Sequence, residues 1–348
     1  MEYIIEDFTP SGGKHCITNA LKQVFDYYDH PLSEAMLFGL GSGLAFTYIN
    51  LANSPMISGR TKPIEFEEKL AERLTIKAKC RKPKNYENCL VKTIKLIQQN
   101  HPVLIYVDMP FMKYLEMAPS SHFGGHAVVL FGFDEEKRLF YVSDRDNSDY
   151  PIRTPRGEIA SDYHLVSYQE IEQARSSSFR PFPAKNKYFE FDFSTYTEPL
   201  TTSIIAAIKD TCKSMLNPPA KLLGINGIIK FSQEILKWQH FSQDKLKIAG
   251  ITNYFQISQD GGTGGGIFRK MYGEFLLEVD AILPNKGIAE LAAGFIHLGD
   301  QWDILAADLW YLGETGDSKI LKPLSKQISE MATTERALLQ QLELTINN

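Results

Sequence analysis

The spacing of apolar residues predicts an amphipathic helix close to the N-terminus. In the segment CITNALKQVFDYY (16–28), apolar side chains recur at intervals of three and four residues, as in a helix with one buried face. Cys16 begins this helix, shortly after the flexible sequence Ser-Gly-Gly (11–13). We therefore expect an exposed thiol where the loop becomes a helix, beside backbone N–H groups that have no helical partner.

The rest of the first half combines predicted helices with short apolar strands. Two apolar runs are joined by the polar turn Asp-Glu-Glu-Lys (134–137), as in a β-hairpin. A short helix with Ser33 as its N-cap is expected to end in the glycine-rich segment 39–43. We predict further helices at 65–74 and 86–100, and strands at 45–52, 103–107, 126–133 and 138–144.

The pattern changes near Thr201, where strand signals disappear and amphipathic helical segments follow one another. The preceding stretch, 151–200, is expected to hold one strand and a linker. The sequence thus predicts an α+β protein of two domains: residues 1–195, in which a helix precedes an antiparallel sheet, and residues 196–348, which are all-α. The predicted helices of the second domain span 201–216, 225–241, 267–282, 287–312 and 318–346.

The composition fits a two-domain protein of the cytoplasm, since 348 residues exceed the usual size of one domain. The 37 basic and 42 acidic residues give a formal charge of −5. The basic residues form no long block along the sequence, which argues against a nucleic-acid partner. The chain starts with an acidic segment, unlike a signal peptide, and no apolar run is long enough to span a bilayer, so we expect neither secretion nor a membrane partner.

Four cysteines lack the paired spacing of zinc or redox motifs, so we expect reduced thiols and no metal site. Cys80, Cys89 and Cys212 are interpreted as surface or packing thiols. Cys16 differs because the start of a helix stabilises a thiolate. A nucleophilic cysteine also needs a base and a group that holds the base. His126, which opens an apolar strand after two glycines, is the candidate base, and a purely structural histidine is the alternative.

The hairpin supplies a partner for His126. If its turn is centred near Glu135, His126 and Asp144 face each other across the two strands. Directly opposed Cβ atoms lie within about 5.5 Å, close enough for a carboxylate to accept the imidazole N–H and fix its tautomer. Asp146 lies on the same face and takes this role instead if the hairpin carries a bulge. Register favours Asp144.

Resemblance to a known family covers most of the chain. The N-terminal domain of the butirosin-biosynthesis acyltransferase family looks similar to GGKHCITNALKQVF, LSEAMLFGLGSGLAF, GGHAVVLFGFD and YVSDRD, and its helical domain to GGTGGGIFRKMYGEFL and WDILAADLWYL. The order of Cys, His and Asp also resembles papain-like folds. The resemblance implies a papain-like first domain with Cys16 as nucleophile, His126 as base and Asp144 as acid.

This resemblance implies a thiol acyltransferase or amide synthetase, similar to those of closthioamide-type assembly lines. Its acyl donor would be the phosphopantetheine thioester of an acyl or peptidyl carrier protein, and its acceptor a small-molecule amine. No nucleotide, cofactor or metal is implied, because thioester exchange is nearly balanced and aminolysis is strongly downhill. The alternatives are a cysteine peptidase or amidase of the same fold and a binding module without catalysis. The acyl group, the amine and the oligomeric state, a homo-oligomer included, stay open.

Three further features leave alternatives open. The glutamine of papain, expected six positions before the nucleophile, is replaced by Pro10, so the second oxyanion donor is open among Ser11, His15 and Asn19. The glycine-rich segment 261–266 precedes a helix bearing Arg269 and Lys270 and is either a phosphate-binding loop or a flexible turn. Aromatic residues of 106–123 either line an aryl-accepting pocket or pack in the core: Tyr106, Phe111, Tyr114 and Phe123.

Overall fold

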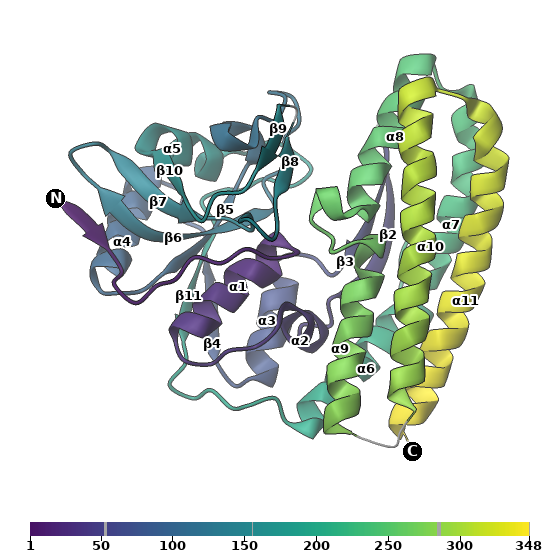
Figure 1. The fold of residues 1–348 in the computed structure, drawn as a ribbon, viewed down its shortest axis with the longest axis horizontal. Coiled ribbons are helices and arrows are strands. Elements are labelled where there is room, and N and C mark those ends of the chain that lie inside the picture. The colour runs from purple at the N-terminus through teal and green to yellow at the C-terminus, as the bar shows by residue number, and fades with distance from the viewer. Residues whose placement is uncertain (52–53, 155, 284–286, 348) are drawn as a thin grey trace. The chain divides into compact units, whose positions relative to one another are not determined.

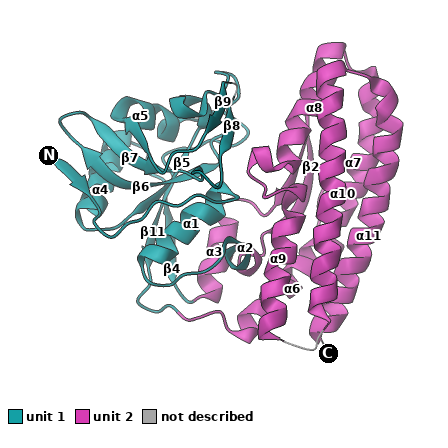
Figure 2. Cartoon of the chain, viewed as in Figure 1, with its two compact units in different colours: residues 1–37, 75–196 teal, residues 38–74, 197–348 magenta. Residues whose placement is uncertain are grey.

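The computed structural model describes residues 1–51, 54–154, 156–283 and 287–347. The chain is of the α+β class, with antiparallel sheet in the N-terminal part and helices in the C-terminal part (Figure 1). It forms two compact units (Figure 2), one of residues 1–37 and 75–196 and the other of residues 38–74 and 197–348.

The first unit is built on an antiparallel sheet in which, within the described residues, seven strands pair. The strand order is β10-β7-β6-β5-β11-β4, and β1 pairs with the end of β6. A separate small hairpin joins β8 to β9. The strands are β1 (Glu2–Ile4), β4 (Lys77–Arg81), β5 (Val103–Val107), β6 (His126–Asp134), β7 (Leu139–Ser143), β8 (Ile152–Thr154), β9 (Gly157–Ile159), β10 (His164–Ser167) and β11 (Tyr188–Asp192).

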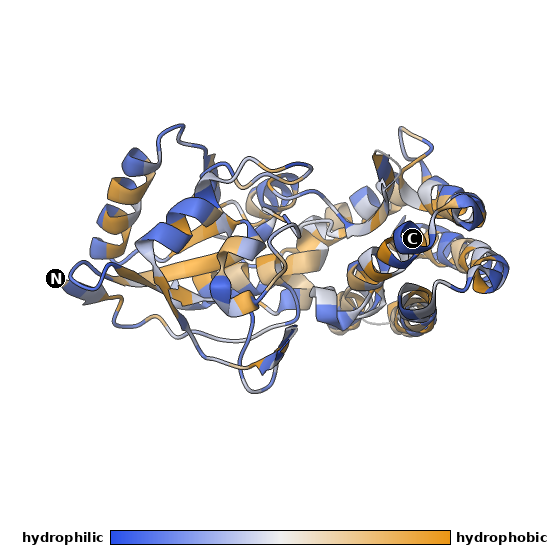
Figure 3. Ribbon diagram, turned by 90° about the horizontal axis from the view of Figure 1, so that it is seen from above, coloured by the Kyte–Doolittle hydropathy of each residue, from blue (hydrophilic) through white to orange (hydrophobic). Residues whose placement is uncertain are grey.

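The centre of this sheet is apolar on both faces. Every residue of β5 and of β6 is buried, as expected for strands covered on both sides. The helices that contact β5 or β6 are α1 (Cys16–Tyr27), α4 (Tyr86–Gln98) and α5 (Tyr168–Ser176). In Figure 3 the strands of the sheet are mostly orange, whereas the helices carry both orange and blue positions. The two central strands therefore form a rigid base for the side chains at their ends.

Local signals set the starts of these helices. The side chain of Asn85 accepts the N–H of Glu87 at 2.7 Å and so caps α4. Ser167 and Glu170 form a capping box at the start of α5. The expected N-cap Ser33 accepts the N–H of Met36 at 2.9 Å, and α2 (Glu34–Leu40) follows it.

The second unit combines a β-hairpin with helices. Its hairpin pairs β2 (Leu44–Leu51) with β3 (Ser54–Arg60), and the side chain of Asn253 holds it. Asn253 Oδ1 accepts the N–H of Ile57 at 3.0 Å, and its Nδ2 donates to the carbonyl of Pro55 at 2.9 Å. The helices are α3 (Glu65–Arg73), α6 (Thr201–Leu216), α7 (Gly224–Ile235), α8 (Gln243–Ile257), α9 (Arg269–Ile282), α10 (Ile288–Thr315) and α11 (Leu321–Asn347).

This division differs from the expected split at 195/196 in one segment. Residues 38–74 were assigned to the first domain, but they group with 197–348. The second unit therefore contains strands and is not all-α. The physical reason is that the hairpin packs against α7 and α8, a non-local contact that periodicity does not reveal. Residue 52, at the end of the predicted strand 45–52, lies outside the described residues.

Helix α8 was missed by the sequence analysis. Apolar residues occur all around it: Leu246, Ala249 and Ile257 are buried, while Ile248 and Phe255 are exposed. An amphipathic stripe is the signal that periodicity detects, and here it is weak. The neighbouring predicted helices lie where α6, α7, α9, α10 and α11 are found, with ends that differ by a few residues.

A buried ion pair lies in the core of the second unit. Arg269 Nη2 lies 2.8 Å from Glu335 Oε1, and both side chains are 0% exposed. The Nη1 of Arg269 also donates to the carbonyl of Ile267 at 2.7 Å. The guanidinium lies over the ring of Trp302, 5.6 Å from its centroid. The two charges are therefore balanced inside an apolar core.

Glu335→Ala should lower the free energy of unfolding by about 3–5 kcal/mol, because it leaves the Arg269 charge buried without a partner. All three tryptophans (Trp238, Trp302, Trp310) lie in the second unit, so tryptophan fluorescence in urea reports its unfolding.

Glu330→Ala is the matched control on the same helix. Its carboxylate is 66% exposed, and its removal should change stability by at most about 1 kcal/mol. The double change Arg269→Met with Glu335→Leu should recover part of the loss, since it removes both charges. Equal effects of Glu335→Ala and Glu330→Ala would contradict the importance of the pair.

Candidate active site around Cys16

Helix α1 begins at Cys16 with His15 as its N-cap. The thiol is buried, with Cys16 only 8% exposed, so the expected exposed position was wrong. The preceding loop folds over the helix start: Gly13 N–H donates to the carbonyl of Arg145 at 2.8 Å, and Asn19 Nδ2 donates to the carbonyl of Ser11 at 2.9 Å. The approach is so close that a Cβ on Gly13 would clash with Asn19. Close packing therefore requires glycine there.

A carboxylate from the start of α2 fixes the turn before Cys16. Glu34 accepts the N–H of Lys14 at 2.7 Å and the N–H of His15 at 3.1 Å. It also accepts the hydroxyl of Thr18 at 2.6 Å. A negative charge beside the first turn of a helix is stabilised by the helix dipole. Glu34 therefore holds the conformation in which α1 presents Cys16.

The structure brings His126 and Asp144 together. His126 Nε2 lies 2.7 Å from Asp144 Oδ2, and both side chains are buried. Cys16 and His126 are close enough for each to shift the pKa of the other. Because Nε2 contacts Asp144, Nδ1 is left for the thiol. The structure therefore places a carboxylate on one nitrogen of His126 and the Cys16 thiol near the same imidazole.

The register behind this contact differs from the expected one. Val129 pairs with Ser143 and Leu130 with Val142, and a bulge follows Leu130. The pairing that placed His126 directly opposite Asp144 was therefore wrong. The ladder ends at Ser143, and Asp144 lies one residue farther, diagonally across from His126. The contact survives because diagonal neighbours on one face remain within reach of long side chains.

The Asp144 carboxylate is held by three donors. Its Oδ2 accepts the phenol O–H of Tyr114 at 2.8 Å besides the bond with His126, and its Oδ1 accepts the N–H of Arg145 at 2.7 Å. Burial alone raises the pKa of Asp144, but the charge of His126 and these hydrogen bonds lower it to about 2. Sequence analysis identified Tyr114 only as an aromatic residue and missed this contact.

Asp146, the alternative partner of His126, bonds to another histidine. Its Oδ1 and Oδ2 lie 2.9 and 3.0 Å from Nε2 of His164. The ring of Tyr114 stacks on that imidazole, with centroids 3.8 Å apart and an interplanar angle of 6°. The bulge that was expected to favour Asp146 as the partner of His126 is present. Asp146 nevertheless bonds to His164.

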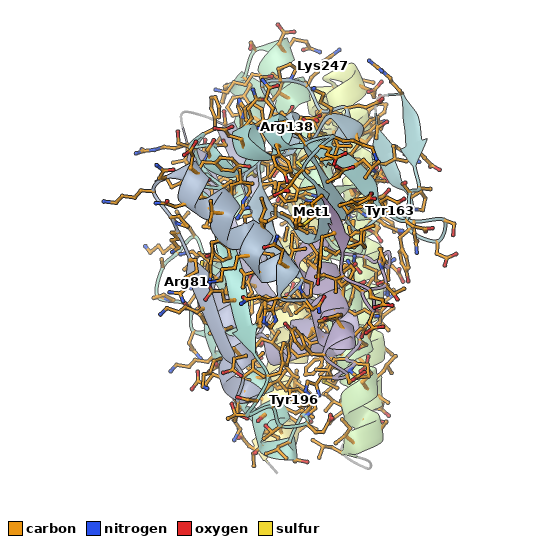
Figure 4. All side chains as sticks on the ribbon, turned by 90° about the vertical axis from the view of Figure 1, so that its left-hand side faces the viewer. Met1, Arg81, Arg138, Tyr163, Tyr196 and Lys247 are labelled. Atoms are coloured by element: carbon orange, nitrogen blue, oxygen red, sulfur yellow. The ribbon has the colours of Figure 1, made fainter. Side chains whose placement is uncertain are left out.

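The side-chain alternation of β10 turns His164 inward. His164 and Val166 are buried, whereas Leu165 is exposed, as the period of two in a strand requires. Tyr163, just before the strand, is 45% exposed and is labelled on the surface in Figure 4. His164 was missed by sequence analysis, and this alternation is the signal that was available.

Electrostatics favour a charged pair at the sulfur. Burial alone raises the pKa of Cys16, but the charges of His15 and His126 and their hydrogen bonds bring it well below its ordinary value of 9.0. Burial lowers the pKa of His126, but the charge of Asp144 and the bonds to Asp144 and Cys16 raise it to about 10. Between these two pKa values the pair is a thiolate and an imidazolium.

The other cysteines lack such surroundings. Cys89 and Cys212 are fully buried, and burial raises the pKa of both, that of Cys212 to about 12. Cys80 lies on strand β4 and is partly buried. Only Cys16, among the cysteines, lies at a helix start beside histidines.

The glycine-rich segment 261–266 is bonded to carboxylates of its own unit. Gly266 N–H donates to Asp303 Oδ1 at 2.7 Å. The ammonium of Lys270 lies 2.8 Å from Asp303 and 2.8 Å from Asp300. Arg269 is the partner of Glu335. The groups that a phosphate would use already hold internal carboxylates, which favours the structural interpretation of this segment.

The aromatic residues of 106–123 have separate roles. Tyr106 is fully buried within β5, and Phe123 packs edge-on against Phe182, 5.4 Å between centroids. Phe111 packs beside Phe179 at 6.4 Å. Of this group, Tyr114 donates its hydroxyl hydrogen to Asp144, the partner of His126.

The structure is that of an α+β protein in which a buried cysteine lies near a buried histidine that contacts a buried aspartate. Residues 15–145 match the family model for the N-terminal part of butirosin biosynthesis protein H, and residues 169–342 match a domain of unknown function, DUF4872. The chain belongs to the family of proteins of the butirosin biosynthesis protein H type. DUF4872 forms the C-terminal part of the chain. A search of curated proteins gives no match. Among the described residues, no helix is both long and apolar enough to cross a bilayer.

The alkylation of Cys16 by iodoacetamide should fall less steeply than that of an ordinary thiol as the pH is lowered below 9, because the charges of His15 and His126 outweigh burial and hold the pKa of Cys16 well below 9.0. An ordinary thiol loses reactivity about tenfold for each pH unit below its pKa. The pH profile is the measurement, by peptide mass spectrometry, since burial of Cys16 affects the absolute rate.

His126→Ala should move the pH profile of Cys16 toward that of an ordinary thiol, because it removes one of the two imidazoles that lower the pKa of Cys16. Cys80 in the same samples is the internal control. A tenfold fall per pH unit at Cys16 of the unchanged protein would show that its thiolate is not stabilised.

Proposed function

We propose that this chain is an acyltransferase of natural-product biosynthesis that forms amide bonds through an acyl-Cys16 intermediate. The donor is the phosphopantetheine thioester of an acyl or peptidyl carrier protein, and the acceptor is a small-molecule amine. The observation that carries the proposal is the buried thiol near His126, whose imidazole contacts the carboxylate of Asp144. The helix that begins with the cysteine and the sheet that bears the other two residues support a papain-like first unit. Membership in the butirosin biosynthesis protein H family supports acyl transfer.

The first step transfers the acyl group to the protein. The Cys16 thiolate attacks the thioester carbonyl and forms a carbon–sulfur bond. The bond to the pantetheine sulfur then breaks, and His126 gives its proton to the departing thiolate. One thioester replaces another, so the step is nearly balanced and needs no nucleotide.

The second step forms the amide. The amine nitrogen attacks the acyl-cysteine carbonyl and loses a proton to the now neutral His126. The carbon–sulfur bond breaks, and Cys16 leaves as the thiolate, which restores the starting ion pair. Asp144 stays ionised throughout and stabilises the imidazolium, and Tyr114 holds Asp144.

Burial of the thiol favours transfer over hydrolysis. A peptidase or amidase with the same three residues would deliver water to the acyl-cysteine. Cys16 is 8% exposed, and exclusion of water protects a reactive intermediate until the proper acceptor arrives. The same burial is expected to slow hydrolysis of the acyl-enzyme.

Incubation with an acyl-pantetheine thioester should raise the intact mass of the protein by one acyl group, on Cys16. Cys16→Ala should abolish the mass increase, whereas Cys80→Ala, a matched change on β4, should keep it. Addition of amines should then release the acyl group as an amide faster than water releases it as an acid. Faster release as the acid would identify a hydrolase, and absence of acylation would contradict both enzymes.

Asp144→Asn should slow acylation of Cys16 on the order of 10²- to 10⁴-fold, because the amide inverts the hydrogen-bond preference at His126 Nε2. The loss should be smaller than that of Cys16→Ala, because His126 remains. Single-turnover acylation rates measure the effect.

Asp146→Asn is the matched control two residues along the chain. Since Asp146 bonds to His164, its replacement should reduce the acylation rate much less. If Asp146→Asn caused the larger loss, the assignment of Asp144 as the partner of His126 would be wrong.

A further inference from the structure

The proposed acyl transfer needs hydrogen-bond donors that stabilise the negative charge developing on the carbonyl oxygen. Each step passes through a tetrahedral intermediate whose carbonyl oxygen becomes an oxyanion. The backbone N–H of Cys16 belongs to the first turn of α1, where N–H groups lack helical partners. It is therefore suited to be one donor. A second donor cannot come from position 10, because a proline side chain has no N–H or O–H.

Asn19, one of the three sequence candidates, is committed to structure. Its Nδ2 donates to the carbonyl of Ser11 at 2.9 Å and to the carbonyl of Asp144 at 3.2 Å. An amide nitrogen has two protons, and these two bonds use both. Asn19 therefore ties the N-terminal loop to the end of β7 and has no proton left for an oxyanion.

His15 lies beside the sulfur. Its Nδ1 is 4.0 Å from Cys16 Sγ, and the residue is 5% exposed. Its backbone, as the N-cap of α1, is held by Glu34 at 3.1 Å. The Cys16 thiol thus interacts with two imidazoles, those of His15 and His126.

The 4.0 Å separation suits contact with an oxyanion better than contact with sulfur. In an adduct on Sγ the oxygen lies two bonds from the sulfur, and a productive donor lies about 2.7–3.1 Å from that oxygen. A nitrogen 4.0 Å from Sγ can therefore lie at hydrogen-bond distance from an oxygen that is two bonds from the same sulfur. Buried donors fixed before the reaction stabilise such a charge most effectively.

The two histidines have different surroundings. His126 is bonded to the carboxylate of Asp144, which is what a residue that accepts and returns protons requires. His15 is the N-cap of α1, next in the chain to the Cys16 N–H, and its Nδ1 lies 4.0 Å from the sulfur. Proton transfer therefore falls to His126.

We propose that His15 is a catalytic residue that donates a hydrogen bond from Nδ1 to the oxyanion on the acyl carbon attached to Cys16. This role rests on the proposed acyl transfer. His15 keeps its proton during the reaction, and no bond to it is made or broken. The rival role is purely electrostatic: His15 then raises the thiolate fraction of Cys16 without contacting the oxyanion.

Two reactions of Cys16 separate these roles. Acylation by p-nitrophenyl acetate passes through an oxyanion and is followed by release of p-nitrophenol. Alkylation by iodoacetamide uses the same thiolate but forms no oxyanion. The activated ester needs no carrier protein, so His15 can be tested even if acyl-pantetheine fails as a donor and the proposed function falls.

The variants are His15→Leu, which keeps volume without a donor, and His15→Gln, which keeps an N–H donor without a ring. After correction for the thiolate fraction from the pH profile, His15→Leu should slow acylation about 10²- to 10³-fold. The corrected alkylation rate should stay within a few-fold of that of the unchanged protein. The corrected acylation rate of His15→Gln should be at least about tenfold higher than that of His15→Leu.

Other outcomes overturn the proposal. Equal losses in acylation and alkylation for His15→Leu would assign His15 the electrostatic role only. Unchanged acylation would remove it from the reaction. If His15→Leu does not fold, His15→Met takes its place, and failure of His15→Gln to acylate faster than this donor-free variant contradicts the hydrogen bond.

Discussion

The bond between His126 and Asp144 makes a charged thiolate possible in the interior of the first unit. A buried ion is unstable unless it is paired and hydrogen-bonded. Cys16 and His126 are almost completely buried, so their ion pair depends on the carboxylate behind the imidazole. Without Asp144, burial would lower the pKa of His126, and the positive charge of His126 that helps to lower the pKa of Cys16 would be lost.

The sheet places these charges because its centre is apolar and its ends are not. Strands β5 and β6 are buried along their length, and His126 begins β6 opposite Val107, the last residue of β5. Asp144 follows the last residue of β7. The ionisable groups thus lie where the ladders end, and two donors join the start of α1 to residues just beyond β7: Gly13 N–H to the carbonyl of Arg145 and Asn19 Nδ2 to the carbonyl of Asp144.

The sequence predicted what local patterns encode. The helix that starts at Cys16, the Ser33 cap and the hairpin of β6 and β7 all follow from periodicity and turn residues. Asp144 was correctly predicted to contact His126, but on a wrong register, because a bulge after Leu130 shifts the pairing. Gly132, inside the strand, is a local signal of that bulge. Burial of Cys16, the hydroxyl of Tyr114 and the place of 38–74 depend on contacts between distant segments. Periodicity within one segment cannot reveal such contacts.

Two aspartates and two histidines lie close together in this unit, and their pairing must be fixed. Asp144 and Asp146 are two residues apart, so exchange of partners would leave His126 with a different geometry. Tyr114 opposes this exchange: its hydroxyl bonds to Asp144, and its ring stacks on His164, the partner of Asp146. One side chain thereby contacts a member of each pair. The orientation of His126 toward Cys16 therefore depends in part on Tyr114, which acts through its hydrogen bond to Asp144.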